Sequence, residues 1–165
     1  MIRRAGIEVE YDPDLGVFDR RQKNEEEISW LQESQQVTEE AVELVCRMIA
    51  NSSPNANGVL MQGGRSLTSE NLRLLVDQFF LEKGFIHRPA IIAGGPPAAD
   101  CHNLGWGELK TGSPIIVDIF PTNRETHYCG DCTRTVVHGD VPDEVVRMHA
   151  AVAAAKKPLP RRLRR

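Results

Sequence analysis

The sequence contains no apolar run that approaches the roughly 20 residues needed to span a membrane as a helix. Its first residues, MIRRAGIEVEYD, lack the apolar core of a secretory signal peptide. The formal net charge is only −3, which gives no indication of binding to nucleic acid or to a membrane surface. Four cysteines without a secretion signal are typical of reduced thiols. The sequence therefore predicts a soluble, cytoplasmic protein.

The length and the periodicity of the chain predict one domain of mixed secondary structure. At 165 residues the chain can build one core but not two comfortable ones. Apolar residues at helical spacing predict three helices: residues 25–50, capped by Asn24; residues 69–83, stopped by Gly84; and a third that begins near Asp143. GVLMQ and PAIIAG between them are short β-prone segments.

The most informative segment is residues 115–135, IIVDIFPTNRETHYCGDCTRT. Two β-prone runs flank the turn-rich TNRE, which predicts an antiparallel hairpin. Folding the segment at this turn pairs Thr122 with His127 and Asp118 with Asp131. The two aspartates would then lie directly opposite each other on one face, with their Cβ atoms about 4.5–5.5 Å apart.

Two opposed carboxylates in an apolar strand indicate a metal site. IIVDIF is apolar on both sides of Asp118, which predicts an interior strand, and a buried carboxylate is costly unless it is paired or bound to a cation. Hard dications accept carboxylate oxygens, and two-metal hydrolytic sites hold their ions about 3.5–4 Å apart. The alternative is that Asp118 and Asp131 lie on a solvated face, and the strand pattern alone leaves both interpretations open.

His102 lies in CHNLGWG, which follows a Gly/Pro-rich loop and precedes the hairpin. A single histidine in a loop is most often only solvated. Next to a metal site, however, an imidazole can orient a substrate or stabilise developing charge. We therefore take His102 as a candidate catalytic residue.

The C-x-x-C motif formed by Cys129 and Cys132 raises the alternative of a zinc site. The chain has no second C-x-x-C, so Cys101 and His102 would have to complete the four ligands. In a strand, side chains three residues apart point to opposite faces, which argues against this arrangement.

The order of His102, Asp118 and Asp131, the last within GDCTRT, resembles the pita-bread metallopeptidases. This family includes methionine aminopeptidase, Xaa-Pro aminopeptidase, prolidase and creatinase. RRQKNEEEI, SLTSENLRLLVDQFFLEKGF and VVHGDVPDEVVRMHAAVAAA are similar to successive segments of its Xaa-Pro aminopeptidase branch. The resemblance covers about residues 18–157. It implies an α/β (α+β) partial pita-bread fold, with helices covering an antiparallel, hairpin-containing sheet.

The resemblance also implies an activity and a role for each site residue. In the family the first aspartate, here Asp118, chelates one metal ion, and the second, here Asp131, bridges two. The histidine, here His102, helps to position the substrate. These roles imply a metallo-aminopeptidase with two divalent ions (Mn, Co or Zn), whose metal-activated hydroxide removes the residue that precedes proline. Peptides with proline at the second position are then the expected substrates, and a homodimer is left open.

The sequence also departs from the family in ways that affect the expected activity. Twelve residues separate the two aspartates, more than is common in the family, and no H-x-x-G-H motif is present. The remaining metal ligands of the family, a histidine and two glutamates, lie in a second half of the catalytic domain. We therefore expect residues 1–19 to be a residual linker, residues 20–157 a first half-domain, and residues 158–165 an aberrant basic tail.

We expect weak metal binding and little or no peptidase activity from the chain by itself, since two aspartates cannot fix two ions. A non-catalytic pita-bread module that binds peptides or partners remains the alternative function.

Overall fold

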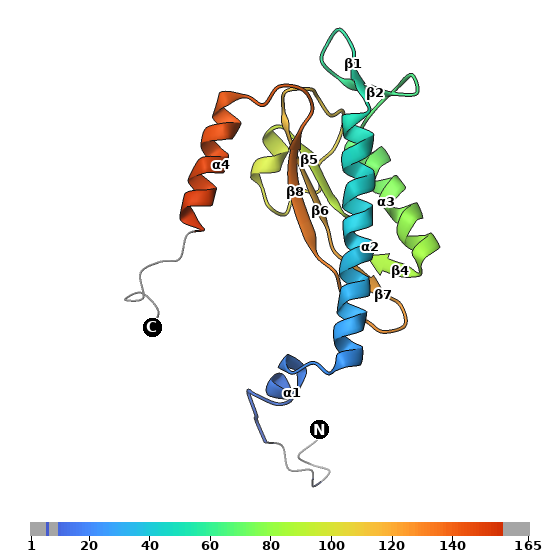
Figure 1. Ribbon diagram of the computed structural model, residues 1–165, viewed down its shortest axis with the longest axis vertical. Coiled ribbons are helices and arrows are strands. Elements are labelled where there is room, and N and C mark those ends of the chain that lie inside the picture. The colour runs from blue at the N-terminus through green and yellow to red at the C-terminus, as the bar shows by residue number, and fades with distance from the viewer. Residues whose placement is uncertain (1–5, 7–9, 157–165) are drawn as a thin grey trace.

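Helix α2 (Glu25–Ala50) begins where the sequence predicts because Asn24 caps it. The Asn24 side chain accepts a hydrogen bond from the backbone N–H of Glu27, whose carboxylate accepts one from the backbone N–H of Asn24. The computed structural model describes residue 6 and residues 10–156 (Figure 1). The predicted tail at 158–165 and part of the predicted linker lie outside the described residues.

The other helices also follow local sequence rules. Helix α3 (Ser69–Lys83) is capped by the Thr68 side chain and ends at Gly84, whose φ of 78° is the left-handed conformation typical of helix ends. The bounds of the shorter helices are α1 (Val17–Arg21), the 3₁₀ helix η2 (Pro96–Ala99) and α4 (Asp143–Ala155). The sequence pattern predicted α2, α3 and α4 and missed α1.

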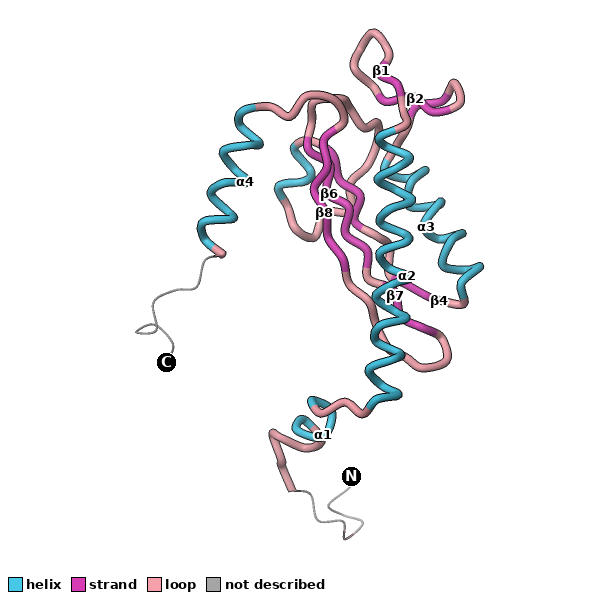
Figure 2. The backbone as a smooth tube through the Cα atoms, in the orientation of Figure 1, coloured by secondary structure: helices cyan, strands magenta, loops and turns pink. Residues whose placement is uncertain are grey.

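Within the described residues, the strands form three small antiparallel sheets (Figure 2). The orders are β1-β2-β3, β4-β7 and β5-β6-β8. The bounds are β1 (Ser53–Pro54), β2 (Leu60–Gln62), β3 (Arg65–Ser66), β4 (Phe85–His87), β5 (Ile91–Gly94), β6 (Pro114–Ile119), β7 (Pro121–Asn123) and β8 (Cys132–Val137). The β5-β6-β8 sheet carries the segment that the sequence marks as functional.

Strand β6 has one face in the core and one face open. Ile115, Val117 and Ile119 are fully buried in the main hydrophobic cluster, whereas the residues between them, Ile116 and Asp118, are only half-buried. Helix α2 contacts β6 and β8, and α3 contacts β5, so the two helices cover the same face of the sheet (Figure 1). The opposite face, which carries Asp118, is covered by neither helix.

The hairpin forms, but its predicted register is wrong by two residues. Asp118 pairs with Thr133 rather than with the second aspartate. The reason is that the turn lies one residue later than predicted: the Asn123 N–H donates to the Tyr128 carbonyl over 2.9 Å, and His127, within the turn, adopts a left-handed φ of 61°. A shift of two residues preserves the alternation of side chains, so both aspartates still belong to one face. In this register Asp118 and Asp131 are diagonal neighbours, for which the typical separation is roughly 7–8 Å, and they are not directly opposed.

Across the described residues, no helix is both long enough and apolar enough to cross a membrane. All four cysteines are free.

Candidate metal and substrate site

Asp118 lies on the open face of the β5-β6-β8 sheet, at the wall of a cavity. On β8 it is paired with Thr133, whose hydroxyl donates a 2.5 Å hydrogen bond to one oxygen of the Asp118 carboxylate. On the other side, β5 places Ile91 opposite Asp118. The cavity has a volume of about 320 Å³, and Asp118, Thr133 and Ile91 are among the residues that line it. One carboxylate oxygen is thus fixed by the sheet, and the group borders a space where a ligand can bind.

Asp131 immediately precedes β8 and is exposed. Its backbone N–H donates a 3.2 Å hydrogen bond to the side-chain oxygen of Gln35 on α2. Gln35 on α2 therefore positions the backbone of Asp131. Because the next residue, Cys132, belongs to the core, the alternation of side chains assigns Asp131 to the open side of the sheet. The structure does not place Asp131 in the wall of the Asp118 cavity.

Three small residues that the sequence pattern did not indicate fix the segment just before β8, which contains Asp131. Gly130 packs so closely on α2 that a Cβ atom would overlap the hydroxyl of Thr38 and the backbone of Ser34. Ser34 and Thr38 are fully buried. The Thr38 hydroxyl donates to the Ser34 carbonyl over 2.7 Å, and the Ser34 hydroxyl donates to the Tyr128 carbonyl over 3.2 Å. Small polar residues four apart on an otherwise apolar helix face were the available indication.

His102 lies on the loop that follows η2, and this loop reaches the Asp118 cavity. The His102 side chain is exposed, and its backbone N–H donates to the Asp100 carboxylate over 2.9 Å. Asp100 and Cys101, which directly precede it, line the same cavity as Asp118. The structure therefore brings the His102 loop and Asp118 to one cavity, with Asp131 farther along the same face.

The alternative prediction of a zinc site formed by Cys101, His102, Cys129 and Cys132 was wrong. Cys129 is exposed, whereas Cys132 is only 6% exposed and belongs to the hydrophobic core, so the alternation of the strand separates the two thiols. In the described part of the chain, one group of three or more potential metal ligands has its ligand atoms close together, and it contains neither Cys129 nor Cys132.

A family model described as metallopeptidase family M24 matches residues 29–164, which is most of the chain. The chain belongs to metallopeptidase family M24. The pita-bread resemblance inferred from the residues is thereby confirmed. No curated protein matches this M24 chain at a significant level.

Solved structures with the same fold confirm a partial pita-bread architecture. The prolidase from Pyrococcus horikoshii OT3 has a TM-score of 0.71 at 20% identity, over 94% of this chain and 42% of that one. The prolidase from Pyrococcus furiosus has a TM-score of 0.67 at 20% identity, over 89% and 40%. The X-Pro aminopeptidase from Thermotoga maritima has a TM-score of 0.65 at 24% identity, over 86% and 37%. The M24 chain thus spans about two fifths of the length of these structures.

M24 peptidases generally use divalent metal ions, and the two aspartates fit such an ion by their chemistry. Carboxylate oxygens are the ligands that hard dications prefer, and both side chains belong to the open face of the sheet. Among the described residues, however, no third histidine, cysteine or carboxylate clusters with Asp118 and Asp131. The donor set therefore fits a divalent ion in type but is too small to bind one tightly.

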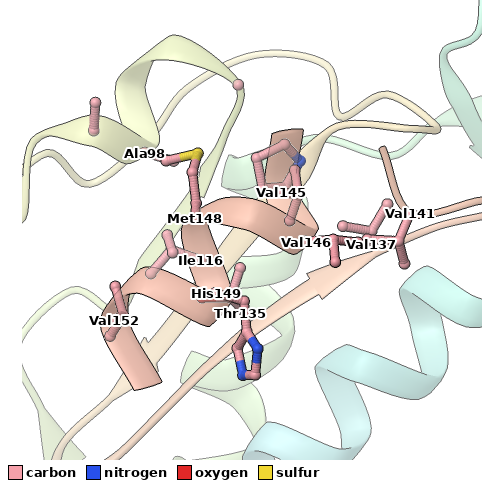
Figure 3. A pocket seen from close by; sticks show the side chains of 13 residues that line it. Ala98, Ile116, Thr135, Val137, Val141, Val145, Val146, Met148, His149 and Val152 are labelled. Carbon is pink, nitrogen blue, oxygen red and sulfur yellow. The ribbon is translucent and has the colours of Figure 1, made fainter. Parts of the chain in front are cut away.

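A second cavity lies beside the candidate site, between α4 and the open face of the sheet (Figure 3). Its volume is about 560 Å³, and its walls are mainly apolar: Ile116 and Val137 on the strands, and Val145, Met148 and Val152 on α4. Helix α4 buries none of its own residues. The open face of the sheet therefore carries apolar side chains beside the site, with Thr135 between them on β8.

The loop of the hairpin is anchored to the N-terminal end of α2. The Tyr128 hydroxyl donates a 2.6 Å hydrogen bond to a carboxylate oxygen of Glu27, and the Tyr128 ring lies 5.6 Å from the ring of Trp30. The bond from Tyr128, and then the bond from the Asn24 backbone, lower the pKa of Glu27 below its ordinary 4.5. The same bond raises the pKa of Tyr128 above its ordinary 10.0.

These shifts predict how the stability of a Tyr128→Phe variant depends on pH. Since the folded-state pKa of Glu27 is lowered, its stabilising contribution is complete above pH 4.5 and is lost as the pH falls through that lowered pKa. The contribution of Tyr128 is complete below pH 10.0 and is lost as the pH rises through its raised pKa. Urea denaturation should therefore show Tyr128→Phe to be less stable than the unmodified chain between these limits, with a smaller difference in acid.

Tyr11→Phe is the matched control, because Tyr11 is 86% exposed. It should unfold like the unmodified chain at every pH. A Tyr128→Phe difference that stays constant down to pH 3 would rule out the charged Glu27 partner.

Proposed function

We propose that this chain provides the metal- and substrate-binding half-site of an aminopeptidase of the Xaa-Pro type. In this proposal Asp118 and Asp131 are metal ligands, and His102 positions the peptide. One observation carries it: Asp118 and the His102 loop border the same cavity on the open face of the sheet. The alternation of side chains before Cys132 supports assigning exposed Asp131 to that face as well. The substrate class, a peptide with proline at the second position, is supported by structural relatives that are prolidases and an X-Pro aminopeptidase.

Each residue contributes a separate property to such a site. The Thr133 hydroxyl occupies one oxygen of Asp118 and fixes the orientation of the carboxylate. The Gln35 contact fixes the backbone of Asp131. His102 is exposed, so its ring can accept or donate a hydrogen bond to a peptide at the cavity. A bound divalent ion (Mn, Co or Zn) would supply Lewis-acid polarisation of the scissile carbonyl and a water of lowered pKa.

In this proposal residues 20–157 form the first half of a catalytic domain, and the chain alone binds metal weakly and turns over little substrate. Two carboxylates offer a dication only part of the six to eight oxygens or the four ligands that stable sites provide. Robust cleavage of an Xaa-Pro peptide by this chain with added Mn²⁺ or Co²⁺ would contradict the expected inactivity. It would leave the metal ligands themselves to be tested separately.

Calorimetric titration with Mn²⁺ tests the ligands directly. We expect measurable weak binding to the unmodified chain and a loss of affinity of about 10-fold or more in Asp118→Asn and in Asp131→Asn, since even residues that only support metal ligands are worth that much. Asp140→Asn, which changes an exposed aspartate away from the site, should bind like the unmodified chain.

The same titration separates the two candidate functions. A chain with the circular dichroism of a folded protein that gives no heat with Mn²⁺ would favour a non-catalytic module that binds peptides or partners. Equal affinity in Asp118→Asn and Asp140→Asn would remove Asp118 from the metal site.

A further inference from the structure

Asp100, Cys101 and His102 form a cluster of potential metal ligands that the proposed peptidase site does not use as ligands. A carboxylate oxygen of Asp100, the Sγ of Cys101 and a ring nitrogen of His102 all lie within 4.8 Å of one another. No other group of three or more such residues is this compact in the described ranges of the chain. The cluster also differs from the excluded zinc set, because all three ligands come from one loop.

The loop that presents this cluster is fixed to the fold at both ends. The Asp100 N–H donates to the Pro97 carbonyl at the end of η2, over 3.2 Å. Beyond the cluster, the Leu104 carbonyl accepts a 3.1 Å hydrogen bond from the Ile92 N–H of β5. Inside the loop the Asn103 N–H donates to the Asp100 carbonyl over 3.1 Å. The backbone of the cluster is thus held in place, and only side-chain rotations are needed to gather the three ligands.

The spacing of the three ligand atoms is close to that of a tetrahedral site. Bonds of about 2.3 Å to sulfur and about 2.0–2.1 Å to nitrogen or oxygen separate the ligand atoms of such a site by roughly 3.3–3.8 Å. All three side chains are exposed, so they can close the remaining distance without displacing buried groups.

The chemistry of the donors selects the class of metal. A thiolate, an imidazole and a carboxylate suit Zn²⁺ and its analogue Co²⁺, whereas Mg²⁺ and Ca²⁺ require an all-oxygen shell. We infer that Asp100, Cys101 and His102 bind a zinc-class dication at the rim of the Asp118 cavity. On binding, the Cys101 thiol releases its proton to solvent and the thiolate sulfur forms the bond to the metal. The fourth position is left to water or to a ligand in the cavity that Asp100 and Cys101 share with Asp118.

This site is separate from the proposed Asp118–Asp131 ligands. Its metal ion would be bound by a thiolate, whereas the two aspartates offer only oxygen. A metal ion held by the cluster would occupy His102, which the proposed function assigns to the substrate. Binding of a metal ion by the cluster and positioning of a peptide would therefore compete for one imidazole.

Absorption spectroscopy with Co²⁺ tests the inference on the full chain. Cobalt bound to a thiolate gives a near-ultraviolet charge-transfer band, which Asp118 and Asp131 cannot produce because they carry no sulfur. We expect the band to saturate at one Co²⁺ per chain, to be bleached by added Zn²⁺, and to be absent in Cys101→Ser. Asp100→Asn and His102→Ala should weaken Co²⁺ binding by about 10-fold or more, as expected of residues at a metal site.

Cys129→Ser is the matched control, since Cys129 is another exposed thiol outside the cluster, and it should keep the band. Asp118→Asn should also keep it, whether or not the proposed peptidase site exists. Circular dichroism confirms that each variant is folded. The inference is overturned by the absence of a band in the unmodified chain, by a band that persists in Cys101→Ser, or by its loss in Cys129→Ser. Loss of the band in Asp118→Asn would overturn the separation of the two sites.

Discussion

Gly105→Ala should destabilise the chain by about 3 kcal/mol, the largest effect that we expect from any single substitution near the site. Gly105 has a φ of 76°, a left-handed conformation that costs a residue with a side chain about 1–2 kcal/mol. A Cβ atom there would also overlap the Ile92 carbonyl and lie 2.6 Å from the Ala93 Cα. Both contacts are with the backbone of β5, which cannot rotate away as a side chain can.

Gly107→Ala in the same loop separates the two causes. Gly107 has nearly the same φ, 75°, but a Cβ atom there would meet nothing within 4 Å. Gly107→Ala should therefore cost only the conformational part, about 1 kcal/mol. Urea denaturation of the two variants measures the difference, and equal losses would show that the His102 loop is not pressed against β5.

Gly130→Ala should cost about 2–3 kcal/mol, because an added methyl group there enters the contact between the hairpin and α2. The φ of Gly130 is not in the left-handed region, so the backbone itself tolerates alanine. The cost arises from the Thr38 hydroxyl and from the Ser34 backbone, whose carbonyl carbon would lie 2.9 Å from the new Cβ. Because Asp131 follows directly, the same substitution should also weaken Mn²⁺ binding.

A double variant tests this explanation. Thr38→Ala removes the hydroxyl that the new methyl group would strike, so Gly130→Ala combined with Thr38→Ala should be less destabilised than the sum of the two single losses. Complete recovery is not expected, since the Ser34 backbone remains in place. Strictly additive losses would mean that the Gly130 methyl group does not meet Thr38.

The candidate site was partly predictable from the sequence because some of its determinants are local. Strand alternation placed Asp118 and Asp131 on one face of the sheet, and a register error of two residues left this prediction unaffected. The register itself depended on the position of the turn, which the Asn123–Tyr128 hydrogen bond closes with His127 in the left-handed conformation, and the turn-rich composition did not specify that position. The prediction of direct opposition therefore failed, while the observed register is compatible with a shared face.

The sequence by itself determined the elements whose causes lie within a few residues. Asn24 and Glu27 cap α2 because their side chains accept hydrogen bonds from nearby backbone N–H groups. Gly84 ends α3 because a residue without a side chain adopts the left-handed conformation easily. Only the tertiary structure decided which distant segments meet. It seated Gly130 on Ser34 and Thr38, and it brought the Asp100–His102 loop to the cavity of Asp118. Such contacts depend on the packing of several elements at once, and the pattern of any single segment does not contain that information.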